Sequence, residues 1–113
     1  MIRPINMVPA KAKLFRSVGE ESRLTVLEAL IPGERHVTDL AEYTQQSQST
    51  VSTHLAALHG VGLVIRAHDG RQVRYGLAHP SVVRLLAAAE ETVLSTSGQE
   101  YACASPCCNT PEG

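Results

Sequence analysis

The chain has 113 residues and a formal net charge of −1, with 43% hydrophobic and only 4% aromatic residues. This length suits one small globular domain, and the composition predicts an aliphatic core. No apolar run approaches the roughly 18 residues that a membrane-spanning helix needs, and the first residues lack the apolar segment of a signal peptide. We therefore expect a cytoplasmic protein without membrane contact, in a compartment where thiols stay reduced.

Hydrophobic periodicity predicts short helices in the first half of the chain, after a flexible arm over residues 1–9. Leu24, Leu27 and Ile31 share one face of a helix predicted over 20–31, which a Pro-Gly pair ends. The other helices of this half are predicted over residues 10–18, 37–43 and 48–60.

The helix predicted over 48–60 is amphipathic, because Val51, Leu55 and Leu58 recur at helical spacing. Its outward face is polar and almost uncharged, and Gly60 ends it. The predicted outward residues are Gln48, Ser49, Ser52, Thr53 and His59.

Two β-type segments follow, Leu63–Ala67 and Gln72–Leu77, on either side of His68–Arg71. An Asp-Gly pair between such segments is a strong hairpin signal. Pro80 then suits the first turn of a last helix over residues 80–95. The apolar stripe of that helix is Val82, Leu85, Leu86, Ala89 and Val93.

This order of elements, α-α-α-α-β-β-α, predicts a mainly α protein with a small hairpin: a winged helix-turn-helix domain over residues 10–97. The second helix of the pair would enter the major groove of DNA, where hydroxyl and amide groups suit base edges. The arginines of the hairpin would reach phosphates. The predicted DNA-binding residues are Gln48, Ser49, Thr50, Ser52, Thr53, Arg66, Arg71 and Arg74.

Several segments together resemble the ArsR/SmtB metal-sensing repressors: Arg23–Leu30, Val37–Ala41, Gln48–Leu55, Gly62–Val64 and Asp69–Tyr75. The resemblance covers about residues 10–95. It implies a homodimer formed through the first and last helices, which represses its operon until an inducer weakens its hold on operator DNA. It also implies that His54 belongs to the DNA-reading face, although a structural histidine is the alternative at a position beside the apolar stripe.

Cys103, Cys107 and Cys108 are the three cysteines of the chain, and all lie in a tail predicted over residues 98–113. An odd number of cysteines argues against a disulfide framework. Three thiolates suit the pyramidal coordination of As(III), whereas zinc prefers four ligands. The resemblance supports arsenite as inducer, because some arsenite-sensing members carry a cysteine trio near the C-terminus. Cd(II), Pb(II), Hg(II), Cu(I), a thiol redox switch and incidental thiols remain alternatives.

The family places other metal sites elsewhere, and the resemblance maps them onto three regions of this sequence. At the third helix, His36 stands in a segment without cysteines, where a surface histidine is the simpler interpretation. At the last helix, His79 is retained with Glu90 and Glu91 further along. The third region falls near Ala57 and Val61, which are apolar. The cysteine tail is therefore the predicted site, to which His36 or His79 could add a ligand.

Two other classes of function fit less well. A thiol enzyme would need a Cys-x-x-Cys pair at a helix start or a cysteine in a phosphate-binding loop, and the sequence has neither. A metal-buffering protein would leave the 48–60 helix and the arginines of the hairpin unexplained. We expect a DNA-binding regulator without enzymatic activity.

Overall fold

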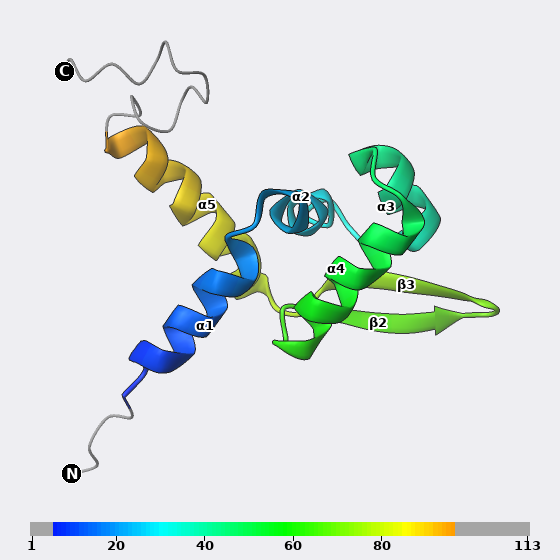
Figure 1. The fold of residues 1–113 in the computed structure, drawn as a ribbon, viewed down its shortest axis with the longest axis horizontal. Helices are drawn as coiled ribbons and strands as arrows, with labels where there is room; N and C mark the ends of the chain where they lie inside the picture. Colours follow the sequence, from blue (N-terminus) through cyan, green and yellow to red (C-terminus); the bar gives the residue numbers. More distant parts are fainter. Residues whose placement is uncertain (1–5, 97–113) are drawn as a thin grey trace. The chain divides into compact units, whose positions relative to one another are not determined.

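The fold is a winged helix-turn-helix, as predicted, in a computed structural model that describes residues 6–96 (Figure 1). The chain divides after His79 into two compact units. The second unit contains α5 (Pro80–Ser95). The first contains α1 (Val8–Val18), α2 (Glu21–Ala29), β1 (Arg35–His36), α3 (Val37–Thr44), α4 (Gln48–Gly60), β2 (Val64–Asp69) and β3 (Gln72–Leu77).

The first two helices differ from their predicted bounds, α1 at its start and α2 at both ends. α1 begins at Val8 rather than at residue 10, because Pro9 lies in its first turn, where the missing N–H costs nothing. α2 ends at Ala29, so the prediction that Ile31 belongs to its apolar face is wrong. Ile31 follows the helix and is 38% exposed, since Pro32 disfavours helical backbone in the residue before it.

The core of the first unit lies between α2, α3, α4 and the base of the hairpin, and it is aliphatic as predicted. Val51, Leu55 and Leu58 supply the α4 side of this core and are fully buried. Such non-directional apolar contacts are the main stabilising term of a small domain. The side chains with almost no exposed surface are Val26, Leu27, Leu30, Leu40, Val51, Leu55, Leu58 and Val64.

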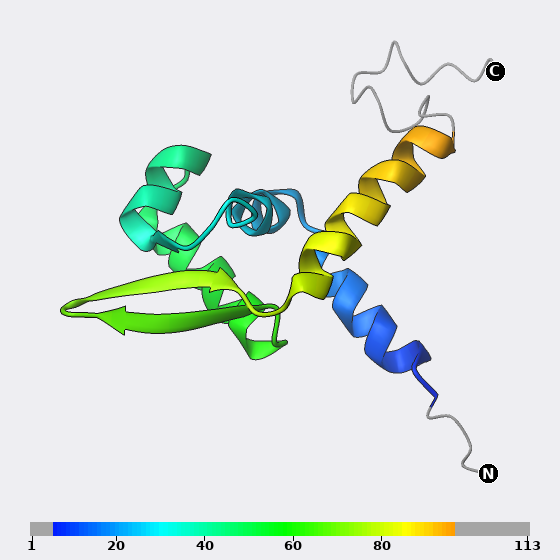
Figure 2. The same ribbon diagram turned by 180° about the vertical axis from the view of Figure 1, so that it is seen from behind.

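The sheet is antiparallel with the strand order β1-β3-β2, and β1 was not predicted. The hairpin register pairs Val64 with Leu77 at its base and Asp69 with Gln72 at its tip. Gly70 adopts a φ of 67°, in the left-handed region that glycine enters without steric cost. Figure 2 shows the hairpin from the other side, extending away from the helices of its own unit.

β1 joins the edge of β3 through two residue pairs, Arg35 with Tyr75 and His36 with Arg74. Gly76 leaves room for the side chain of Glu34, since a Cβ there would lie 2.8 Å from Cγ of Glu34. The segment before α3 is therefore attached to the hairpin, which connects the two halves of the winged-helix motif.

α5 has the bounds that the sequence predicts, and Val82 and Leu86 of its apolar stripe are buried. Leu85 and Val93 are half-buried, whereas Ala89 is exposed. Leu94 is 73% exposed. No helix within residues 6–96 combines the length and the apolar character required to cross a membrane.

Candidate nucleic-acid interface

The start of α4 is fixed by a side-chain cap. Ser47 has extended backbone, and its Oγ accepts a hydrogen bond of 3.0 Å from the backbone N–H of Thr50. The Ser47 hydroxyl lies 2.9 Å from Oγ1 of Thr50. The preceding helix, α3, ends at Thr44 and is capped by Gln45, whose φ of 58° lies in the left-handed region. A serine before an amphipathic run is a typical N-cap signal, and it explains why α4 begins at the predicted residue.

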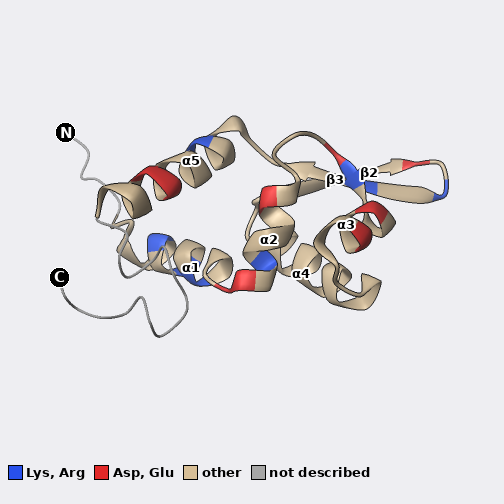
Figure 3. Ribbon diagram, turned by 90° about the horizontal axis from the view of Figure 1, so that it is seen from above, with Lys and Arg blue, Asp and Glu red and all other residues tan. Residues whose placement is uncertain are grey.

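The outward face of α4 is exposed and polar, as predicted, and carries no charge. Figure 3 shows this helix without a basic or acidic residue, whereas the hairpin carries both. Oγ1 of Thr53 donates to the carbonyl oxygen of Ser49 at 3.0 Å. The side chains of Gln48, Ser49 and Ser52 form no hydrogen bond within residues 6–96, so their donors and acceptors face solvent. The exposed predicted residues are Gln48, Ser49, Thr50, Ser52 and Thr53.

His54 differs from the other predicted DNA-binding residues of α4, because its side chain is directed toward α2. Its Nε2 atom lies 2.8 Å from Oγ of Ser22 and 3.8 Å from a carboxylate oxygen of Glu20. The side chain is only 12% exposed. This geometry favours the alternative interpretation of His54 as a structural histidine over the predicted contact with DNA.

The three predicted arginines of the hairpin are exposed but differ in their partners. Nη2 of Arg74 lies 3.3 Å from Oδ2 of Asp69, and its Nη1 lies 3.8 Å from Oε1 of Glu34. Arg66 and Arg71 form no ion pair within the described part of the chain. The sequence could not show that Arg74 is shared, since Glu34 reaches it only because β1 pairs with β3.

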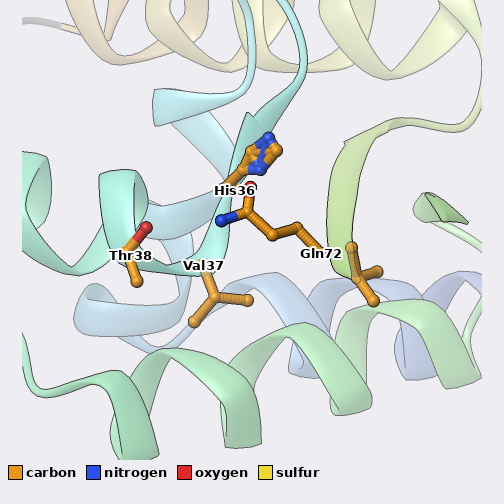
Figure 4. Close-up of a pocket in the computed structure, with 5 residues that line it drawn as sticks. His36, Val37, Thr38 and Gln72 are labelled. Carbon is orange, nitrogen blue, oxygen red and sulfur yellow. The ribbon is translucent and has the colours of Figure 1, made fainter. Parts of the chain in front are cut away.

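His36 is not the surface histidine that the sequence suggested. It is the residue before α3, its side chain is 20% exposed, and its Nε2 lies 3.8 Å from Oδ2 of Asp69. The Nδ1 atom is buried without a hydrogen-bond partner. A pocket of about 230 Å³ lies beside it (Figure 4). The residues that line the pocket are His36, Val37, Thr38, Gln72 and Val73.

The predicted metal ligands lie outside the described residues: Cys103, Cys107 and Cys108 all fall in the segment 97–113. Within residues 6–96, no group of three or more His, Cys, Asp or Glu side chains is arranged to hold a metal ion. Ala57, at one position of the third family site, is half-buried on α4, and Val61 follows the end of that helix.

The sequence of residues 20–66 matches the profile described as "Bacterial regulatory protein, arsR family". The chain is 38% identical over 86 residues to the HTH-type transcriptional regulator CmtR of Mycobacterium tuberculosis, covering 76% of this chain and 73% of that protein. It is 35% identical over 75 residues to a probable mercury resistance operon repressor of Streptomyces lividans, covering 66% and 60% of the two chains.

Solved structures with the same fold include two mycobacterial proteins. The crystal structure of Rv0081 from M. tuberculosis superposes with a TM-score of 0.77 at 26% identity, covering 86% of this chain and 98% of the other. A homodimeric winged helix-turn-helix DNA-binding domain from Mycobacterium bovis gives a TM-score of 0.70 at 29% identity, with coverages of 82% and 90%.

Proposed function

The chain belongs to the ArsR family of bacterial regulatory proteins, and from this premise we propose that it is a transcriptional repressor released from operator DNA by a thiophilic metal or metalloid. The observation that carries the proposal is the exposed, uncharged polar face of α4 in a helix-turn-helix. We assign the protein no enzymatic activity and place its action in the cytoplasm. Residues 10–97 would form the DNA-binding and dimerisation domain, with the cysteine tail over 98–113 attached to it.

We assign base recognition to the first two turns of α4. An amide such as that of Gln48 can pair with an adenine edge through two hydrogen bonds, and serine and threonine hydroxyls can donate or accept. Gln48, Ser49 and Ser52 keep these groups free for DNA. Thr50 and Thr53 are exposed on the same two turns.

We assign phosphate contacts to the hairpin. Because the net charge of the chain is −1, attraction to DNA has to come from local cations rather than from the whole molecule. Arg66 and Arg71 are exposed, and the structure gives them no acidic partner among residues 6–96. Arg74 would have to exchange Asp69 or Glu34 for a phosphate, so we expect a smaller contribution from it.

We propose that the active species is a homodimer formed through α1 and α5. α1 buries none of its side chains in the single chain, and its Phe15 is 56% exposed. Leu94 of α5 is also exposed. Apolar side chains that a single chain leaves in water are typical of an association surface. The related M. bovis domain is homodimeric. Sedimentation of the wild type and of Phe15→Asp would test this, with a dimer expected only for the wild type.

We propose Cys103, Cys107 and Cys108 as the inducer site and As(III) as the first candidate inducer. Three thiolates with no fourth cysteine in the sequence match the trigonal preference of As(III). Hg(II) is the second candidate, because the S. lividans relative is described as a probable mercury resistance operon repressor. Cd(II), Pb(II), Cu(I) and a thiol redox switch are further alternatives for the same three thiols.

The test is fluorescence anisotropy of a DNA fragment from the protein's own promoter, titrated with reduced wild-type protein. As(III), Hg(II), Cd(II), Pb(II) and Zn(II) are then added separately. We expect As(III) to release the DNA, and a variant with all three cysteines changed to serine to bind DNA but ignore As(III). Release of that variant by As(III) would overturn the cysteine site. Release of the wild type only by an oxidant would favour the redox switch.

A further inference from the structure

A polar junction surrounds the first turn of α2 and joins it to the DNA-reading helix. Oγ of Ser22 lies 3.0 Å from both carboxylate oxygens of Glu20 and 2.8 Å from Nε2 of His54. An ionised carboxylate only accepts hydrogen bonds, so the single hydroxyl proton of Ser22 goes to Glu20. His54 therefore donates from Nε2 to the oxygen of Ser22. The hydrogen bonds run in one direction, from α4 through Ser22 to Glu20.

The same turn of α2 is also bonded to its N-cap, to the end of α1 and to the turn before α4. The backbone N–H of Arg23 donates to Oε1 of Glu20 at 2.8 Å, which makes Glu20 the N-cap of α2. Nη1 of Arg23 donates to the carbonyl oxygen of Ser17 at the end of α1, at 3.0 Å. Nε2 of Gln46, in the turn before α4, donates to the carbonyl oxygen of Ser22 at 3.1 Å. The first turn of α2 is therefore bonded to the end of α1 and to the turn before α4.

The hydrogen bond from His54 is a directional contact, which the rest of the inner face of α4 lacks. The buried neighbours Val51, Leu55 and Leu58 are aliphatic: they turn this face of the helix inward, but their contacts are non-directional. A hydrogen bond of 2.8 Å is directional and weakens steeply when its angle changes. Figure 1 shows α2 beside α4, and the His54–Ser22 bond spans these two helices.

We propose that His54 is a positioning residue. Its hydrogen bond to Ser22 sets the rotation of α4 about its axis and thereby the direction in which the outward face of that helix meets DNA. This proposal rests on the proposed function for its DNA readout. It differs from the sequence-based expectation, in which His54 itself contacts DNA. A change at Ser22 distinguishes a positioning role of His54 from a direct contact with DNA, because Ser22 lies on α2 and not on the predicted DNA-contacting face.

The first test is a double-mutant cycle on operator affinity with His54→Leu, Ser22→Ala and the double variant. Each single change is expected to weaken operator binding about three- to tenfold, the range of one net hydrogen bond, and the double variant to be no weaker than the worse single one. Thr25→Ala is the matched control, since Oγ1 of Thr25 bonds only within α2, to Glu21. It should bind like the wild type.

A conservative variant separates positioning from simple loss of structure. The amide nitrogen of His54→Gln can take the place of Nε2 and donate to Ser22, whereas the shorter amide of His54→Asn cannot reach it. We expect His54→Gln to recover most of the affinity and His54→Asn to bind like His54→Leu. Two results would overturn the proposal: full affinity in Ser22→Ala, or a loss confined to one base pair of the operator when His54 is changed.

Amide hydrogen exchange of the free protein tests the junction without DNA. Ser22→Ala should raise exchange along residues 48–60 relative to Thr25→Ala, because α4 loses its directional contact. Unchanged exchange in α4 would contradict the proposal. If the wild type showed no preference for operator over scrambled DNA, the proposed function would fail, and this exchange result would still decide the role of His54.

Discussion

Helix α4 and the β2–β3 hairpin are both predicted to contact DNA, yet the protein holds them in different ways. α4 is attached by fully buried aliphatic side chains and by the directional hydrogen bond between His54 and Ser22. In β2 only Val64, at the base of the hairpin, is buried. The outer hairpin relies on strand pairing and on half-exposed ion pairs at Asp69 and Arg74.

This difference matches the two tasks of a DNA-binding surface. Base edges are read by hydrogen bonds whose geometry is strict, and a firmly positioned helix suits them. Phosphates are attracted by charge, and an exposed hairpin with arginines can adjust to them. We therefore expect changes in the attachment of α4 to affect stability and specificity, and changes in the hairpin to affect mainly salt-dependent affinity.

The largest effect should come from the buried side of α4. Leu55→Ala removes a fully buried side chain and should lower the free energy of unfolding by about 2–5 kcal/mol. Ser52→Ala, on the exposed side of the same helix, should change it by less than about 0.5 kcal/mol. Denaturant titrations of the two variants measure both. Equal losses of unfolding free energy in the two variants would contradict the distinction between a buried and an exposed face of α4.

A smaller effect is expected at the N-cap of α4. Ser47→Ala removes the acceptor of the Thr50 N–H and should cost about 1 kcal/mol of stability. Ser47→Asp keeps a capping oxygen and should retain most of that stability. Chemical denaturation followed by circular dichroism compares the two. A Ser47→Asp variant as unstable as Ser47→Ala would show that the cap does not hold this helix.

In the hairpin, Asp69→Asn removes the carboxylate that lies 3.3 Å from Arg74 and 3.8 Å from His36. Because these pairs are half exposed, the loss of stability should stay below about 1 kcal/mol and shrink in high salt. DNA affinity should rise, since Arg74 is released and a negative charge is removed. Unfolding and anisotropy measurements at two salt concentrations check both directions. Weaker DNA binding would contradict the assignment of Arg74 to phosphate contact.

The smallest effect should be a pH dependence of stability that arises from Glu20 in the polar junction between α2 and α4. The Arg23 backbone N–H, and then the Ser22 hydroxyl, hold the pKa of the Glu20 carboxyl below its ordinary value of 4.5. A lowered pKa stabilises the fold above 4.5, and this stabilisation is lost as pH falls through the pKa in the folded protein. Wild type should exceed Glu20→Gln in stability at pH 7, and the gap should close in acid. A constant gap between pH 7 and 3 would contradict this.

The elements that local sequence specifies were predicted, although β2 runs from Val64 to Asp69 rather than from Leu63 to Ala67, because His68 and Asp69 pair with β3. α4 runs between a capping Ser47 and the predicted stop at Gly60, and the hairpin forms around an Asp-Gly pair, so both were found from short-range signals. β1 was missed because two residues carry no periodicity, and only pairing with β3 makes them a strand.

Side-chain direction at the site could not be predicted in the same way. His54 occupies a helical position between the apolar and polar faces, and a partner 32 residues earlier decides which way it points. The direction of His36 likewise depends on Asp69, across the sheet. Hydrophobic periodicity placed His54 beside the apolar stripe and so offered a structural role, but it could not identify Ser22 or Asp69 as partners, because these contacts join segments distant in sequence.

The most direct test of the DNA-reading surface is the dependence of DNA affinity on salt concentration, measured for operator and scrambled DNA. The variants are Arg71→Ala and Ser52→Ala beside the wild type. We predict that Arg71→Ala lowers the slope of log affinity against log salt by about one on both DNAs. Ser52→Ala should keep the slope and reduce the preference for operator. A wild type without operator preference, or a slope changed by Ser52→Ala and not by Arg71→Ala, would contradict the assigned roles of α4 and the hairpin.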